Sequence, residues 1–253
     1  MGVKVVPFGA TAAPRSMVPG LVLAAVAAAV AWGLYASGLA ADILRYRKDI
    51  VYLTRQHLVL VGASGSAAIA CGVALGVWLS RPSMRRRAEG VIQAVNMATS
   101  IPTLAKLALM MSLLGIGALP AIVGLWIATL LPIVRNTYEG IRAVPGHLID
   151  AARGMGMGPR AILARVELPN ALFVIFAGVR TAMAVNVGTA PIAFLIGGGG
   201  LGELIFTGID LQEHGMMLAG AIPTALLAVA VDFLFGQAQY WLVPRGVNPL
   251  RQP

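Results

Sequence analysis

The sequence predicts an all-α fold, a polytopic membrane helical bundle with about six transmembrane helices. Of the 253 residues, 58% are hydrophobic and only 11% are charged, against roughly 25% charged residues in a soluble domain. The mean hydropathy of +0.82 points the same way. Apolar runs recur at lengths near the roughly 20 residues that a helix needs to cross the hydrocarbon core. Without a long linker or repeat to divide it, the chain is expected to form one membrane domain.

Six apolar runs are the candidate spans, and they lie near residues 19–40, 58–80, 91–113, 119–137, 170–196 and 216–241. The first resembles a secretory signal in that Lys4 and Arg15 precede an alanine-rich stretch. Its apolar part continues from Leu21 to Ala41 without a convincing cleavage site, which favours an uncleaved anchor.

Loop charges predict the orientation. Arginines gather in residues 81–90, in residues 135–169 and in the tail, whereas residues 197–215 hold three carboxylates and no basic residue. Because short cytoplasmic loops carry an excess of Lys and Arg, both termini and residues 135–169 are expected in the cytoplasm. The net charge of +9 therefore fits a membrane surface rather than a nucleic-acid partner.

Residues 41–57 do not fit this orientation, because they would be external and yet carry four basic residues. Ile43, Tyr46, Ile50 and Leu53 recur at helical spacing, which predicts an amphipathic segment lying in the membrane interface. The expected organisation is an anchor and interfacial segment over 1–57, followed by a membrane core over 58–245.

A charged segment, LIDAARGMGMGPRAILARVELP at 148–169, separates two long apolar runs. Residues 148–153 can form a short helix with Asp150 near its N-terminus, where the helix dipole favours a carboxylate. Ala151 and Ala152 would keep the surface of this helix low enough to fit a groove. Three glycines would then let the chain turn before a second helix begins at Pro159, namely Gly154, Gly156 and Gly158. We expect a rigid projection that a partner protein can bind.

The spacing of this segment, Asp150-Ala151-Ala152, then Gly156, then Val166-x-Leu168-Pro169, resembles the EAA loop of ABC-importer permeases. Asp150 and Val166 stand where Glu and Ile are usual. The resemblance implies a coupling loop over 137–169 that binds a cytoplasmic ABC ATPase subunit. The residues expected to make this contact are Asp150, Ala151, Ala152, Gly154, Gly156, Leu168 and Pro169.

The resemblance extends from about residue 51 to 245, and several stretches are similar to the osmoprotectant branch, which transports glycine betaine, choline and carnitine. They include SIPTLAKLALM at 100–110, RNTYEGI at 135–141 and VGTAPIAFLIGGGGLGELIFTGI at 187–209. This similarity implies a type I permease core in the bacterial inner membrane that moves its solute by alternating access. It also implies three partners besides lipid: the ATPase, a second permease copy or sister permease, and a periplasmic or external substrate-binding protein.

The chain itself is expected to be no enzyme. It lacks the G-x-x-x-x-G-K-[ST] pattern that cradles ATP phosphates, so ATP and Mg would be held by the partner ATPase. The three histidines show no metal-ligand spacing, and no cofactor, catalytic residue or metal site is expected in this chain.

Three charged residues lie inside predicted spans, where an ionisable group is costly unless it is paired or faces water. Arg180 and Asp232 lie about 15 Å and 16 Å from the same side of the membrane, which predicts an ion pair. Lys106 stands where an apolar residue is expected in the family. Asn186 is a candidate contact of the translocation pathway, because an amide in lipid needs a partner, and Thr189 lies in the same polar span.

The stretch Gly197-x-Gly199-x-x-Gly202 matches a dinucleotide fingerprint, but no βαβ unit surrounds it. We expect an external turn instead. It can offer Glu203 and Asp210 to the binding protein or to a cationic solute, or it can be a merely flexible connection.

Three alternatives stay open. The solute can be another small amine or amino-acid-like compound. The chain can be an ion-coupled secondary transporter, although such proteins usually show internal repeats and none is convincing here. It can also be a regulatory membrane subunit without a pore.

Overall fold

The computed structural model describes residues 28, 32–33, 35–36, 38–248 and 251. Most of the predicted first span, residues 19–40, lies outside these residues. The chain divides into two units, residues 1–45 and 46–253. The first unit contributes one described helix, α2 (Leu39–Arg45).

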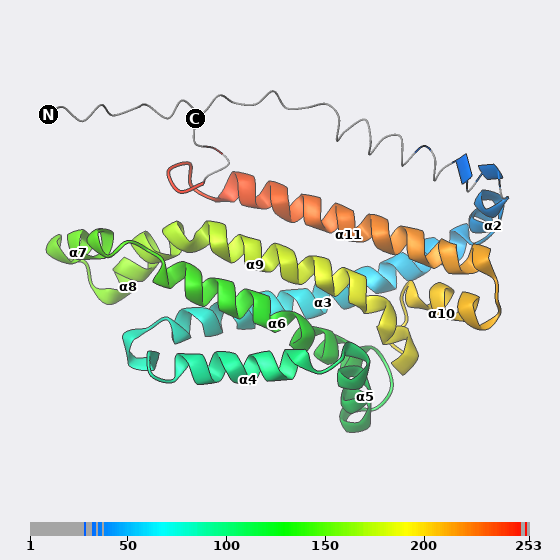
Figure 1. Ribbon diagram of the computed structural model, residues 1–253, viewed down its shortest axis with the longest axis horizontal. Coiled ribbons are helices and arrows are strands. Elements are labelled where there is room, and N and C mark those ends of the chain that lie inside the picture. The colour runs from blue at the N-terminus through cyan, green and yellow to red at the C-terminus, as the bar shows by residue number, and fades with distance from the viewer. Residues whose placement is uncertain (1–27, 29–31, 34, 37, 249–250, 252–253) are drawn as a thin grey trace, which may run out of the picture. The chain divides into compact units, whose positions relative to one another are not determined.

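Every regular element of the described residues is helical, which confirms the all-α fold class. Within these residues, four helical stretches are long and apolar enough to cross a membrane, or five if a bent pair counts as one span. Their main helices are α3 (Arg47–Leu79), α6 (Ala118–Arg142), α9 (Leu168–Thr189) and α11 (His214–Leu242), which run beside one another in Figure 1.

Helix α3 begins much earlier than the predicted span at 58–80. It runs without interruption from Arg47 to Leu79, so residues 47–57 form its first turns and continue directly into the apolar part. The helical spacing seen in this segment is therefore real, but it belongs to a 33-residue helix. A separate anchor over 1–57 stays a prediction.

The predicted span over 91–113 is broken in the structure, because the chain bends there by 92° between α4 (Ala88–Ser100) and α5 (Thr103–Leu114). Pro102 causes the break. A proline lacks the N–H that would continue the helix, and its ring disfavours helical angles at the preceding residue. Ile101 accordingly has an extended ψ of 132°.

The bent pair nevertheless connects the two ends of the bundle. The end of α3 and the end of α6 meet, since Leu79, Arg85 and Arg142 line one pocket. Beyond α5, the chain reaches the opposite end, where the N–H of Gly117 donates to the carbonyl of Ile196 at 2.9 Å. The α4–α5 pair is thus a broken crossing, and the chain traverses the unit in five passes.

Short elements cluster at these two ends (Figure 1). At one, which we call the α7 end, lie η1 (Pro82–Met84), α7 (Gly146–Gly154), α8 (Pro159–Ile162) and the π-helix η2 (Leu163–Glu167). At the other, the α10 end, lie the 3-10 helix η3 (Ala190–Ile196) and α10 (Gly202–Asp210).

Helices α3, α6 and α9 enclose the core, where small residues let backbones approach closely. Leu107, Leu125 and Ile133 are fully buried there. A Cβ on Gly178 of α9 would lie 2.6 Å from the Cβ of Asn136 and 2.7 Å from the carbonyl oxygen of Pro132 on α6. Only glycine therefore fits at this crossing.

Candidate functional site

The segment expected to bind a partner forms a helix, a tight turn and a second helix at the α7 end. Helix α7 covers Gly146–Gly154 and α8 begins at Pro159, the position expected for it. Proline suits the first turn of a helix because its missing N–H has no partner there in any case. In Figure 1, α7 lies beyond the ends of the long helices.

Asp150 does not lie at the start of α7, contrary to the expectation from the helix dipole. The helix begins four residues earlier at Gly146, and its first turn contains no acidic residue. The Asp150 carboxylate instead accepts from Nη1 of Arg153 at 3.3 Å, and its side chain is 73% exposed. The carboxylate is thus open to a partner and only loosely held by an exposed pair.

The two alanines of α7 face different ways. Ala151 is exposed, whereas Ala152 is 1% exposed and packs against the protein itself. Only Ala151 can therefore lie against a partner's groove, and Ala152 attaches the helix to the bundle.

A single glycine makes the turn after α7. Gly156 has φ +78°, the left-handed conformation that closes many helices. Its N–H donates to Arg153 at 2.9 Å and that of Met157 donates to Ala152 at 3.1 Å, the paired bonds of a Schellman motif. Gly154 is the last residue of the helix and Gly158 has φ −72°, so neither needs the left-handed region.

The second half of the segment leads into α9 through a widened turn. Residues 163–167 form a π-helix directly before Leu168 and Pro169, which are half-buried at the start of α9. Pro169 cannot donate a backbone hydrogen bond to this turn, which agrees with the wider hydrogen-bond spacing of a π-helix. Glu167 pairs with Arg81 beyond α3, with 2.7 Å between Nη2 and Oε2. The segment is thereby tied to the end of α3.

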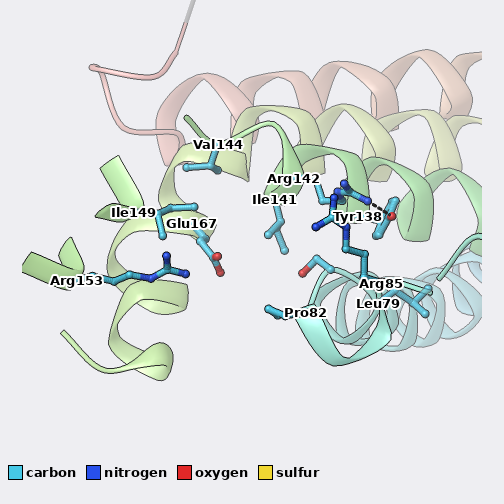
Figure 2. Close-up of a pocket in the computed structure, with 11 residues that line it drawn as sticks. Leu79, Pro82, Arg85, Tyr138, Ile141, Arg142, Val144, Ile149, Arg153 and Glu167 are labelled. Atoms are coloured by element: carbon cyan, nitrogen blue, oxygen red, sulfur yellow. Dashed lines mark hydrogen bonds between the residues drawn. The ribbon is translucent and has the colours of Figure 1, made fainter. Parts of the chain in front are cut away.

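A pocket of about 290 Å³ separates α7 from the bundle (Figure 2). Tyr138 accepts a hydrogen bond of 2.7 Å from Arg142, as the dashed line shows. Arg153 extends from α7 towards Glu167, and Arg85 and Tyr138 lie across the pocket from these two residues. The pocket is lined from all sides by Leu79, Ser80, Pro82, Arg85, Tyr138, Ile141, Arg142, Val144, Ile149, Arg153 and Glu167.

The structure brings Arg180 and Asp232 together between α9 and α11. Nε and Nη2 of Arg180 each donate to a different carboxylate oxygen of Asp232 at 2.5 Å. The pair predicted from matched depths is therefore present. Gly236 lies beside the guanidinium, and the two charged side chains line a pocket of about 500 Å³ with Tyr240.

Asn186 lies inside the α3–α9 contact and has no exposed surface. Its Nδ2 donates to the hydroxyl oxygen of Ser64 at 2.9 Å. The Ser64 hydroxyl in turn donates to the carbonyl oxygen of Leu60 at 2.7 Å. Two turns before Ser64 on α3, Nε2 of the buried His57 lies 3.2 Å from the carbonyl oxygen of Val187. The Asn186 amide thus bonds to Ser64 of a neighbouring helix, a partner that the sequence did not identify.

The remaining polar candidates bond locally. Lys106 is 4% exposed, and its Nζ donates to the carbonyl of Thr99 at 3.0 Å. This bond places a cation at the C-terminal end of α4, where the helix dipole favours positive charge, so Lys106 holds the bend at Pro102. The Thr189 hydroxyl donates to Val185 of its own helix at 2.9 Å.

The glycine stretch after η3 packs against α3 and forms an ordered turn. Gly197, Gly199 and Gly200 all have positive φ. The N–H of Gly200 donates to Oε1 of Gln56 at 3.0 Å, and a Cβ there would lie 3.4 Å from Cα of His57. Of the two carboxylates expected near this turn, Glu203 lies in the first turn of α10 and Asp210 is its last residue.

These features define a class: a helical bundle whose long helices are apolar enough to cross a membrane, with a helix-turn-helix projection at one end. Residues 68–246 match the family described as the binding-protein-dependent transport system inner membrane component. The chain belongs to this family and is the permease subunit of an ABC importer in the inner membrane, a type that works with an ATPase and a binding protein.

Individual relatives agree with this family assignment. The chain is 48% identical over 202 residues to the osmoprotectant import permease protein OsmY of Salmonella typhimurium, covering 79% of this chain and 86% of the relative. It is 39% identical over 204 residues to the choline transport system permease protein OpuBB of Bacillus subtilis, covering 81% and 93%. Its fold matches a chain of the inward-facing MetNI methionine ABC transporter with a TM-score of 0.66 at 24% identity, covering 79% and 96%.

Proposed function

We propose that this permease moves a quaternary-ammonium osmoprotectant into the cell by alternating access. Two findings support the solute class: the identity of 48% to an osmoprotectant permease and of 39% to a choline permease. The translocation path would form between this chain and a second permease, either an identical copy or a sister chain. An external binding protein would deliver the solute. Another small amine is the alternative solute.

The observation that carries the mechanism is the projecting α7–Gly156–α8 unit with its exposed Asp150. A cytoplasmic ATPase that binds ATP and Mg would hold this unit in a groove through Asp150, Ala151 and the turn. Closure of the ATPase would then move α7, and the continuous run from Pro159 into α9 would carry the motion into the membrane. The permease would perform no chemistry of its own.

The proposed orientation places the α7 end and both termini in the cytoplasm. The loop after α3 carries Arg81, Arg85, Arg86 and Arg87 at this end, as expected for a cytoplasmic surface. The α10 end, with its acidic residues, would then face outward.

The intramembrane polar residues would serve assembly more than solute contact. In the described structure Arg180, Asp232, Lys106 and Asn186 each bond to another part of the protein, and Thr189 bonds within its helix. The Arg180–Asp232 pair is the most exposed of them, at 42% and 40%.

Reconstitution into liposomes with the partner ATPase and the binding protein tests the proposal. We expect the ATPase to copurify with the permease, and a quaternary amine to stimulate ATP hydrolysis and to accumulate inside. Uptake that follows an ion gradient and ignores ATP would contradict it, and so would hydrolysis that responds only to an unrelated solute.

A further inference from the structure

A pocket of about 360 Å³ lies at the α10 end of the bundle, between α3, α10 and α11. This volume falls within the roughly 300–1,000 Å³ of small-molecule sites. Its floor is apolar, since Leu53 and Leu204 are 3% and 2% exposed and Met216 lies beside them. Its remaining lining consists of two tyrosines and two carboxylates, Tyr46, Tyr52, Asp49 and Glu203.

The tyrosine rings are held by their hydroxyl groups. The hydroxyl of Tyr46 donates to Oε2 of Glu213 at 3.3 Å. The hydroxyl of Tyr52 accepts from Nε2 of Gln56 at 3.0 Å, and Gln56 in turn accepts from the glycine turn at Gly200. Both phenol hydroxyls are therefore hydrogen-bonded to neighbouring side chains, and both tyrosines line the pocket.

The charge of the lining has one sign. Asp49 and Glu203 are both acidic and exposed, and none of the residues that line this pocket is basic. Within the described residues neither carboxylate forms an ion pair, although Arg47, Lys48 and Arg55 belong to the same helix as Asp49. A solute in the pocket therefore meets two negative charges, two aromatic rings and an apolar floor.

This combination selects a particular chemistry. A quaternary ammonium group cannot donate hydrogen bonds, and it binds through aromatic faces and through its charge. Methyl groups around the nitrogen would lie on the leucine and methionine floor. A zwitterion with its own carboxylate would bring a negative charge towards Asp49 and Glu203 and would be repelled.

We propose that this pocket is a solute subsite of the permease that accepts cationic quaternary amines in preference to zwitterionic ones. The proposal rests on the solute class and orientation given under the proposed function, which place the pocket on the outer side. A solute released by the binding protein would meet the pocket before it entered the membrane. Choline would be favoured there over glycine betaine.

The test uses the complete importer in liposomes with one binding protein that accepts both solutes. Because the same binding protein serves every variant, a change in the ratio of choline to betaine uptake reports the permease alone. We expect Glu203→Gln and Asp49→Asn each to lower this ratio roughly two- to fivefold, the effect of one exposed charge or cation–π contact. High salt should reduce the ratio in the wild type, because it screens exposed charges.

Glu89→Gln is the matched control, since it removes the same charge from an exposed residue of α4 that does not line the pocket. Tyr52→Phe keeps the ring and Tyr52→Leu removes it, so only the leucine variant should lower the ratio. Preserved betaine uptake shows that each variant is folded.

Three outcomes would overturn the subsite: a ratio unchanged in both pocket variants, an equal fall in the uptake of both solutes, or an equal effect of Glu89→Gln on the ratio. In each of these the wild type still transports a quaternary amine, and the proposed function stands. If the wild-type importer transports neither solute, the proposed function fails and the subsite fails with it.

Discussion

Arg180 on α9 and Asp232 on α11 form a two-bond ion pair across 52 residues of sequence. Both helices lie among the apolar spans, so each charge compensates the other where water is scarce. In the described structure one other side-chain hydrogen bond joins these two helices. Nε2 of Gln239 on α11 donates to the carbonyl oxygen of Phe173 on α9 at 3.0 Å.

We expect Asp232→Asn to destabilise the permease, because it leaves the Arg180 guanidinium without its partner. The loss should lie between the roughly 1 kcal/mol of an exposed pair and the roughly 3 kcal/mol of a buried one. The measurement is the yield and thermal midpoint of the solubilised importer. Exchanging the two residues, Arg180→Asp with Asp232→Arg, should partly restore both. Equal damage in the single and the exchanged variants would show that the pairing does not matter.

The hydrogen bond between Asn186 and Ser64 should couple α3 to α9. In a double-mutant cycle of Asn186→Ala and Ser64→Ala, we expect a coupling energy of about 0.6 kcal/mol, typical of such bonds between membrane helices. Denaturation of the purified permease in mixed micelles with SDS measures it. Fully additive effects would mean that the two side chains act independently.

Replacing Gly178 by alanine should disturb the α6–α9 crossing, since the added Cβ would lie within 2.7 Å of the Pro132 carbonyl oxygen. Overpacking of this kind costs about 1–3 kcal/mol. Gly188→Ala on the same helix is the control, because a Cβ there meets no atom of the described residues within 4 Å. The thermal midpoints of the two variants should therefore differ, and similar midpoints would count against the close packing.

Gly156→Val should impair coupling while leaving the helices inserted. A β-branched residue at φ +78° is strained by about 1–2 kcal/mol or more, so the turn between α7 and α8 should shift. We expect ATP hydrolysis to persist and uptake per ATP to fall. Gly158→Val is the comparison, because Gly158 has an ordinary φ of −72°. The same loss in both variants would remove the special role of the left-handed turn.

Hydropathy was sufficient to locate the four long apolar helices of the described residues, because each crossing demands a long apolar run whatever its neighbours. The Arg180–Asp232 pair was also predictable, since depth follows from counting residues along straight helices. The bend was missed although Pro102 was a signal, because helices usually end at or before the residue that precedes a proline.

Contacts between residues far apart in the chain could not be predicted from the sequence. Arg81 and Glu167 entered the orientation argument only as loop charges, and nothing in their spacing shows that they pair. The same holds for Ser64 with Asn186. Tyr46, Asp49 and Tyr52 do recur every three residues, a helical signal, but Glu203 joins them only because α10 packs beside the first turns of α3.

Because α3 is one uninterrupted helix, it provides a fixed reference distance inside the transporter. Val51 and Trp78 are exposed near its two ends, one close to the acidic pocket and the other close to the pocket beneath α7. A rigid helix fixes their separation at about 40 Å. Spin labels at these two positions should therefore report one constant distance in every nucleotide state, against which the movement of any other labelled helix can be calibrated.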